Sequence, residues 1–119
     1  MNSILNLIQR GSCILNGVPI SIEEFAPRPW DDSEPMGAYN VGMSKIVIDS
    51  SMSPETKEAT LVHEIIHAID KANALGFSEQ EVSVIATGVY SFLKDNDILQ
   101  KYDLTVNLST GRVFTTPSE

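Results

Sequence analysis

Apolar and polar residues alternate in two stretches of the first half of the chain. Residues 12–24 carry spaced isoleucines and valines around an Asn-Gly turn signal at 16–17, which predicts one broken strand or a tight hairpin. Residues 38–41 and 45–50 flank a short glycine-containing link, and their alternation predicts a second hairpin. The intervening segment 25–35 holds three prolines and three acids, so we expect a loop there.

The spacing of apolar residues changes to a helical period in the second half. Ser53 is a favourable N-cap, and Pro54 suits the first helical position, which predicts a helix from Pro54 to about Asn73 that Gly76 terminates. Ser78 should begin another helix that stops near residue 95.

Strands followed by helices are typical of the α+β class, and 119 residues suit one hydrophobic core. We therefore expect a single domain over residues 1–119. Its last part, residues 102–119, alternates in a way that fits a hairpin or an extended arm.

Charge and cysteine content narrow the classes of partner. The chain has 8 Lys+Arg against 16 Asp+Glu, a net charge of −8, which disfavours nucleic acid and anionic membranes as partners. The single cysteine, Cys13, cannot form an internal disulfide and is expected to be a small buried hydrophobe. The N-terminus lacks the features of a signal peptide, so the expected location is the cytoplasm, and the oligomeric state stays open.

The most informative motif is the run His-Glu-Ile-Ile-His at residues 63–67, which uses both histidines of the chain. Chance would produce it in roughly one in a thousand chains of this composition. On a helix, His63 and His67 lie about 40° and one turn apart, so both imidazoles can converge on one ion. The pattern predicts a zinc site with nitrogen ligands at about 2.0–2.1 Å.

Glu64 lies on the same side of the predicted helix as the two histidines. There its carboxylate can reach a zinc-bound water and act as the general base that activates it. The apolar stripe centres roughly 140° away from the histidines, which argues against histidines buried in the core. A solvated polar face without a metal remains the simpler alternative. The residues of the apolar stripe are Leu61, Val62, Ile65, Ile66 and Ile69.

A catalytic zinc usually has three protein ligands, so a further one is required. Without a third histidine it must be a carboxylate or Cys13, and the second helix offers Glu79 and Glu81. We expect Glu81 to be the ligand, with Glu79 as the second choice. The alternative for Glu81 is a capping-box role, because it stands three residues after Ser78.

Three other polar residues have two interpretations each. Asp70 either accepts the free imidazole N–H of a ligand histidine or is a surface acid. Tyr39 and Tyr90 could each stabilise an oxyanion, although an amphipathic tyrosine at the edge of the core is more common.

The block from Tyr39 to Asn96, about half of the chain, resembles the ImmA/IrrE-like small zinc metallopeptidases, especially short members encoded by phages and prophages. The resemblance is carried by the HExxH core and by the runs at 46–49, 58–69 and 78–86.

This resemblance implies a minimal gluzincin: a zincin-like fold with a small, mostly antiparallel sheet packed on the HExxH helix, followed by a second helix. It further implies His63, His67 and Glu81 as zinc ligands, with Glu64 as the catalytic base. An exposed edge strand at Gly37–Val41 would hold the substrate in extended form.

The expected function is therefore that of a zinc-dependent metallopeptidase. It would hydrolyse peptide bonds of a cytosolic protein, such as a repressor, through a Glu-activated zinc-bound water. One alternative is a zincin-fold binding module with a structural metal or none. Another is a hydrolase of non-peptide amides.

Overall fold

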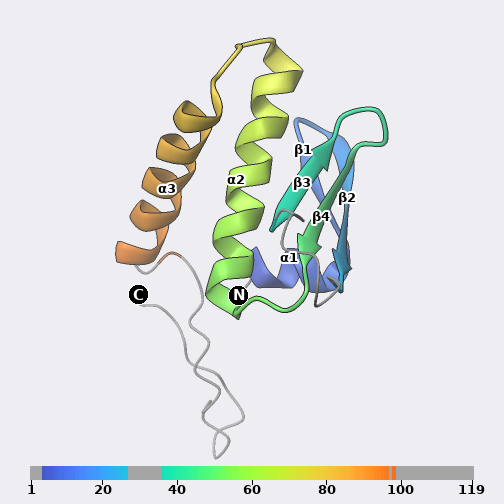
Figure 1. Ribbon diagram of the computed structural model, residues 1–119, viewed down its shortest axis with the longest axis vertical. Helices are drawn as coiled ribbons and strands as arrows, with labels where there is room; N and C mark the ends of the chain where they lie inside the picture. The colour runs from blue at the N-terminus through green and yellow to red at the C-terminus, as the bar shows by residue number, and fades with distance from the viewer. Residues whose placement is uncertain (1–3, 27–35, 97, 99–119) are drawn as a thin grey trace, which may run out of the picture.

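Three helices and four strands form within the part of the chain that the structure, a computed structural model, describes: residues 4–26, 36–96 and 98. The predicted loop therefore falls mostly outside the described residues, and the predicted C-terminal hairpin or arm falls wholly outside them. The elements are α1 (Ile4–Arg10), β1 (Ser12–Leu15), β2 (Val18–Phe25), β3 (Gly37–Asn40), β4 (Lys45–Asp49), α2 (Pro54–Asn73) and α3 (Glu79–Asp95) (Figure 1).

The four strands form one mixed sheet in the order β1-β2-β4-β3. Of the two alternatives for residues 12–24 the hairpin is the one that forms, with β1 antiparallel to β2, and the predicted second hairpin is confirmed, with β3 antiparallel to β4. The first turn uses Asn16 at φ 53° and Gly17 at φ 80°, the left-handed conformations that an Asn-Gly turn supplies. The pairing of β2 with β4 is parallel, which the sequence did not indicate. The α+β class is thus confirmed, with a sheet that is mixed.

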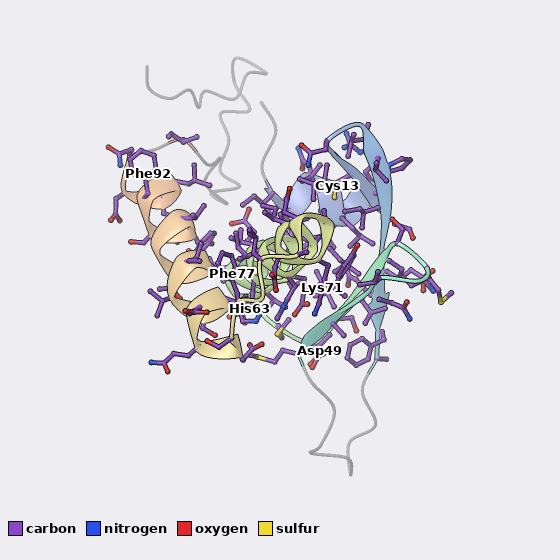
Figure 2. The ribbon with its side chains drawn as sticks, turned by 90° about the horizontal axis from the view of Figure 1, so that it is seen from above. Cys13, Asp49, His63, Lys71, Phe77 and Phe92 are labelled. Atoms are coloured by element: carbon purple, nitrogen blue, oxygen red, sulfur yellow. The ribbon has the colours of Figure 1, made fainter. Side chains whose placement is uncertain are left out.

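Helix α2 lies between the sheet on one side and α3 on the other (Figures 1 and 2). Towards the sheet, Leu61 packs with Ile46 and Ile48, neither of which is exposed. Towards α3, Val62 and Ile66 pack in a second cluster with Val82 and Ala86. The HExxH helix is therefore buried on two sides, which limits where its polar residues can point.

The bounds of α2 agree with the prediction. The Ser53 side chain accepts a hydrogen bond from the Thr56 N–H, and Pro54 is the first helical residue. The residue that closes the helix in the left-handed conformation is Ala74, at φ 52°, rather than Gly76. Within the described residues, no helix combines the length and apolar character needed to cross a membrane.

Helix α1 was not predicted, because its seven residues are too few to display a helical period. Its Ile8 is buried in the core against the sheet and α2. Cys13, the next core residue along the chain, is 6% exposed, which confirms the buried hydrophobe, and burial raises the pKa of its thiol.

A buried carboxylate ties the three helices together. Glu58 on α2 is 1% exposed and accepts hydrogen bonds from the Leu5 N–H of α1, at 3.1 Å, and from the Tyr90 hydroxyl of α3, at 2.9 Å. Burial, and then the bond to Glu58, raise the pKa of the Tyr90 phenol. The phenol therefore stays protonated and continues to donate to Glu58.

We expect Tyr90→Phe to lower the free energy of unfolding by about 1–3 kcal/mol at neutral pH, because it removes a donor from a buried carboxylate. The difference from wild type should narrow above about pH 10, where tyrosine ionises in the unfolded chain while Tyr90 stays protonated in the folded protein. Urea denaturation of both proteins between pH 7 and 11 measures this. A difference that does not change with pH would contradict the assigned phenol–carboxylate bond.

Candidate metal centre

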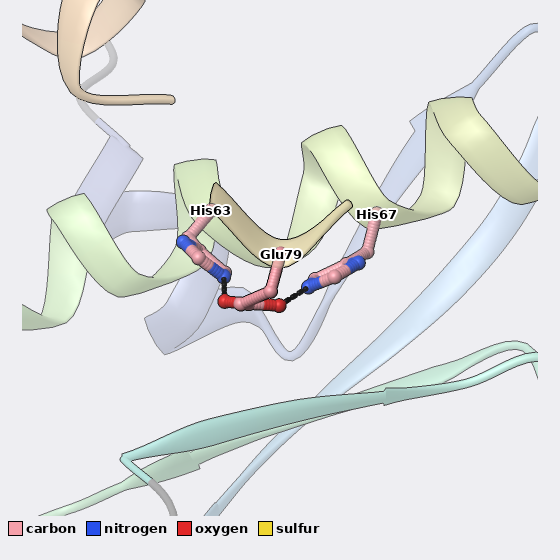
Figure 3. A group of neighbouring side chains, drawn as sticks. All are labelled: His63, His67 and Glu79. Atoms are coloured by element: carbon pink, nitrogen blue, oxygen red, sulfur yellow. Dashed lines mark ion pairs between the residues drawn. The ribbon is translucent and has the colours of Figure 1, made fainter. Parts of the chain in front are cut away.

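Three potential metal ligands from two helices converge at one point (Figure 3). His63 and His67 project from α2, and Glu79 is the first residue of α3. The Oε2 atom of Glu79 lies 2.7 Å from His63 Nε2, and its Oε1 atom lies 3.0 Å from His67 Nε2. The ligand atoms of all three residues lie within 4.8 Å of one another.

The two histidines lie as the i, i+4 spacing predicts. Their ring centroids are 5.0 Å apart, and their side chains are 24% and 23% exposed, so neither ring belongs to the core. Both rings turn Nε2 towards the Glu79 carboxylate (Figure 3).

The donor set suits a transition metal. Zinc binds histidine nitrogen and carboxylate oxygen at about 2.0–2.2 Å, which places neighbouring ligand atoms of a tetrahedron roughly 3.3 Å apart. The contacts of 2.7 and 3.0 Å between Glu79 and the imidazoles are about 0.6 and 0.3 Å shorter than that value, and all the ligand atoms lie within 4.8 Å of one another. A small adjustment of side chains would therefore fit the three residues around one ion, with a fourth position left for water or substrate.

The carboxylate that joins the two histidines is Glu79 and not the expected Glu81. Glu81 does not join this group, because its carboxylate folds back to accept the Ser78 N–H at 2.8 Å while the Ser78 hydroxyl accepts the Glu81 N–H at 3.0 Å. This reciprocal pair is the capping box that the sequence offered as the alternative role. Glu79, the second choice, is the first residue of α3 and takes no part in the capping box, and its carboxylate faces the histidines.

Asp70 also differs from its proposed roles. It is 3% exposed, and its Oδ1 atom accepts the N–H groups of Gly76 at 2.7 Å and Phe77 at 3.2 Å. Asp70 therefore fixes the connection between α2 and α3 and does not orient an imidazole. The sequence signal for this role was an acid near the end of a helix, Asp70, followed six residues later by Gly76, because aspartate side chains often accept backbone N–H groups of a nearby turn.

Glu64 is buried beside the ligand group. Glu64 is 5% exposed, and none of the described residues forms a hydrogen bond or ion pair with its carboxylate. Burial raises the pKa of the Glu64 carboxyl, an effect that the neighbouring His67 and His63 partly offset. Buried polar groups in proteins are normally hydrogen-bonded, so a buried carboxylate that accepts no hydrogen bond from the described residues points to a functional role.

The edge strand β3 approaches α2 next to Glu64. A Cβ atom added at Gly37 would lie 2.6 Å from Thr60 Cγ2 and 3.2 Å from the Val47 carbonyl oxygen. The same atom would lie 3.5 Å from Glu64 Cγ. Only glycine allows the strand to come this close to the helix.

A cleft of about 900 Å³ joins these groups and is walled by α2, α3 and β3. Tyr39 and Tyr90 both line it, although the Tyr90 hydroxyl is already bonded to Glu58. His63 and Lys71 lie on the same side of α2 (Figure 2), and both line the cleft. Lys71 was not predicted as a site residue, although its position one helical turn beyond His67 places it near the same face of the helix. The remaining lining residues are Met36, Gly37, Ala38, Thr56, Ala59, Thr60, Glu64, His67, Glu79, Ser83, Ala86 and Thr87.

Comparisons with protein-family models, with curated proteins and with solved structures found no match to this chain.

We expect the wild-type protein to bind about one zinc per chain and Glu79→Ala to weaken that binding by more than the roughly 10- to 100-fold typical of losing an outer-shell partner. Glu81→Ala should leave zinc affinity nearly unchanged and lower stability by about 0.5–1.5 kcal/mol with or without zinc, because it removes a capping hydrogen bond. Competitive zinc titration and urea denaturation separate the two effects. Equal zinc affinity in wild type and Glu79→Ala would exclude Glu79 as a ligand.

We expect Asp70→Ala to lower the free energy of unfolding by about 1–3 kcal/mol, because the Gly76 and Phe77 N–H groups lose their acceptor. Asp70→Asn keeps a carbonyl oxygen in place, so its loss of stability should be smaller and its zinc affinity close to that of wild type. Urea denaturation and zinc titration of both variants test this. A tenfold or larger loss of zinc affinity in Asp70→Asn, with stability unchanged, would instead support a histidine-orienting role.

Proposed function

We propose that the protein is a zinc-dependent peptidase. The observation that carries this proposal is the meeting of His63, His67 and Glu79 in one open cleft beside Glu64, a buried carboxylate that accepts no hydrogen bond from the described residues. Ligands alone would serve a structural metal equally well, whereas a structural metal has no use for an adjacent base. The combination favours hydrolysis.

Zinc is the ion that best suits this donor set. Two imidazole nitrogens and one carboxylate are borderline ligands, while magnesium and calcium take shells of oxygen atoms. When bound, zinc would supply a Lewis acid that polarises a carbonyl and lowers the pKa of a bound water towards about 7.

The residues of the chain supply the proton transfer. Glu64 lies on the side of α2 that faces Gly37 of β3 and lines the cleft. There its carboxylate can accept a proton from a water and later donate that proton to the leaving amine. Burial raises the pKa of this carboxyl, which brings it closer to the value that a general base at neutral pH requires.

The shape of the cleft favours a peptide as the substrate. β3 is an edge strand of the sheet, and its residues Gly37, Ala38 and Tyr39 line the cleft alongside the candidate ligands. An extended peptide can add to such an edge through main-chain hydrogen bonds, which places its carbonyl groups next to α2. A cytosolic protein such as a repressor would present such a segment, in keeping with the resemblance noted above.

We expect Glu64→Gln to retain zinc and fold while cleavage falls by about 10²- to 10⁴-fold, because the amide has nearly the same volume but cannot accept the proton. The assay is mass spectrometry of a proteome-derived peptide library incubated with zinc-loaded protein. Glu55→Gln, on the exposed first turn of α2, is a matched control that should cleave like wild type.

Undiminished cleavage by Glu64→Gln would assign the base to another residue. Stoichiometric zinc without cleavage of any peptide would contradict the peptidase proposal and favour a binding module.

A further inference from the structure

We propose that Lys71 recognises a carboxylate of the bound peptide, so that the site prefers substrates with an acidic side chain on the N-terminal side of the scissile bond. This inference rests on the proposed peptidase function and adds a substrate class to it.

Lys71 is the single lysine or arginine among the described residues that line the cleft. Apart from the phenols of Tyr39 and Tyr90, the other ionisable groups there belong to His63, His67, Glu79 and Glu64. Glu79 is already engaged by both histidines. A charged group of the substrate would therefore find one unengaged cation in the cleft.

The ammonium group of Lys71 forms no ion pair with the described residues, although acids outnumber bases two to one in the chain. Lys45, Lys57 and Lys94 each hold a carboxylate within 3.1 Å. The adjacent Asp70 turns its carboxylate inwards to the backbone of the α2–α3 connection. Lys71 is thus the described lysine whose charge is available for a ligand.

The position of Lys71 along the cleft sets where the substrate carboxylate would lie. It stands one helical turn beyond His67 and two beyond His63, about 6 and 12 Å along the axis. An extended peptide advances about 3.3 Å per residue, so the carboxylate would lie two to four residues from the bond that is cut.

The direction of β3 determines whether the substrate carboxylate lies on the N-terminal or the C-terminal side of the scissile bond. β3 and α2 run in the same direction (Figure 1). A peptide that pairs antiparallel with β3, the slightly more stable arrangement, would run opposite to both. Its N-terminal part would then lie at the Lys71 end of the cleft, while its C-terminal part would lie towards Ala59, Ala86 and Tyr90, where the lining is more apolar.

Two assays test the inference on the zinc-loaded full chain. The first profiles cleavage of the proteome-derived peptide library by wild type, Lys71→Glu and Lys71→Arg. The second measures, by fluorescence anisotropy, binding of paired synthetic decapeptides to Glu64→Gln protein with and without Lys71→Glu. The peptides in a pair differ only by Glu or Gln at positions two to four before or after the central bond. Lys45→Glu is the matched control, because it makes the same charge change on a strand residue that does not line the cleft.

We expect wild type and Lys71→Arg to favour Asp or Glu before the scissile bond, by about 2- to 5-fold over the neutral amides, as a solvent-accessible ion pair provides. Lys71→Glu should lose this preference and favour Lys or Arg there, while Lys45→Glu keeps the wild-type profile. Identical profiles for wild type and Lys71→Glu would overturn the inference and leave the peptidase function standing.

The binding assay separates the two proposals if no peptide is cleaved. Tighter binding of Glu peptides that depends on Lys71 would then support carboxylate recognition while the peptidase function fails. Equal affinities for the Glu and Gln peptides, unchanged by Lys71→Glu, would overturn the inference. A preference for acids only after the central bond would contradict the antiparallel direction and therefore the proposal as stated.

Discussion

The burial of α2 on two sides is the constraint on which the rest of the structure depends. Leu61 packs against the sheet, while Val62 and Ile66 pack against α3. A helix enclosed in this way leaves little solvent for its polar residues, so its acids need internal partners. Glu58 and Asp70 find them in backbone N–H groups and a phenol. Glu64 is the buried acid of α2 that has no such partner within the described residues, and it is the one beside the histidines.

Local signals predicted the elements well where a few neighbouring residues decide the conformation. The caps at Ser53 and Ser78 and both hairpins are decided in this way. The parallel pairing of β2 with β4 could not be predicted similarly, because it joins residues such as Ile22 and Ile46 that are far apart in sequence. Helix α1 was missed because seven residues are too few to display a helical period, and a helix this short depends on tertiary contacts for its stability.

The candidate site likewise combines a feature that neighbouring residues decide with one that depends on long-range packing. The i, i+4 spacing of His63 and His67 is a local relation, and the structure brings the two rings together. The identity of the third candidate ligand depends on how α3 meets α2, where either of two glutamates could face the histidines. A side chain at the third helical position reaches its own N-cap more easily than a neighbouring helix, so Glu81 completes the capping box and Glu79 remains free to turn to the histidines.

The close approach at Gly37 has a consequence for how this sequence can change over evolutionary time. The space between the edge strand and α2 accepts a hydrogen atom at position 37 but not a methyl group, because the Thr60 methyl fills it. An alanine at position 37 becomes acceptable on this side only if position 60 becomes smaller, for example serine. The Val47 carbonyl would still be close, at 3.2 Å. Among descendants of this chain, we therefore expect positions 37 and 60 to vary as a pair. A larger residue at position 37 should accompany a smaller one at position 60, so that their combined volume is conserved.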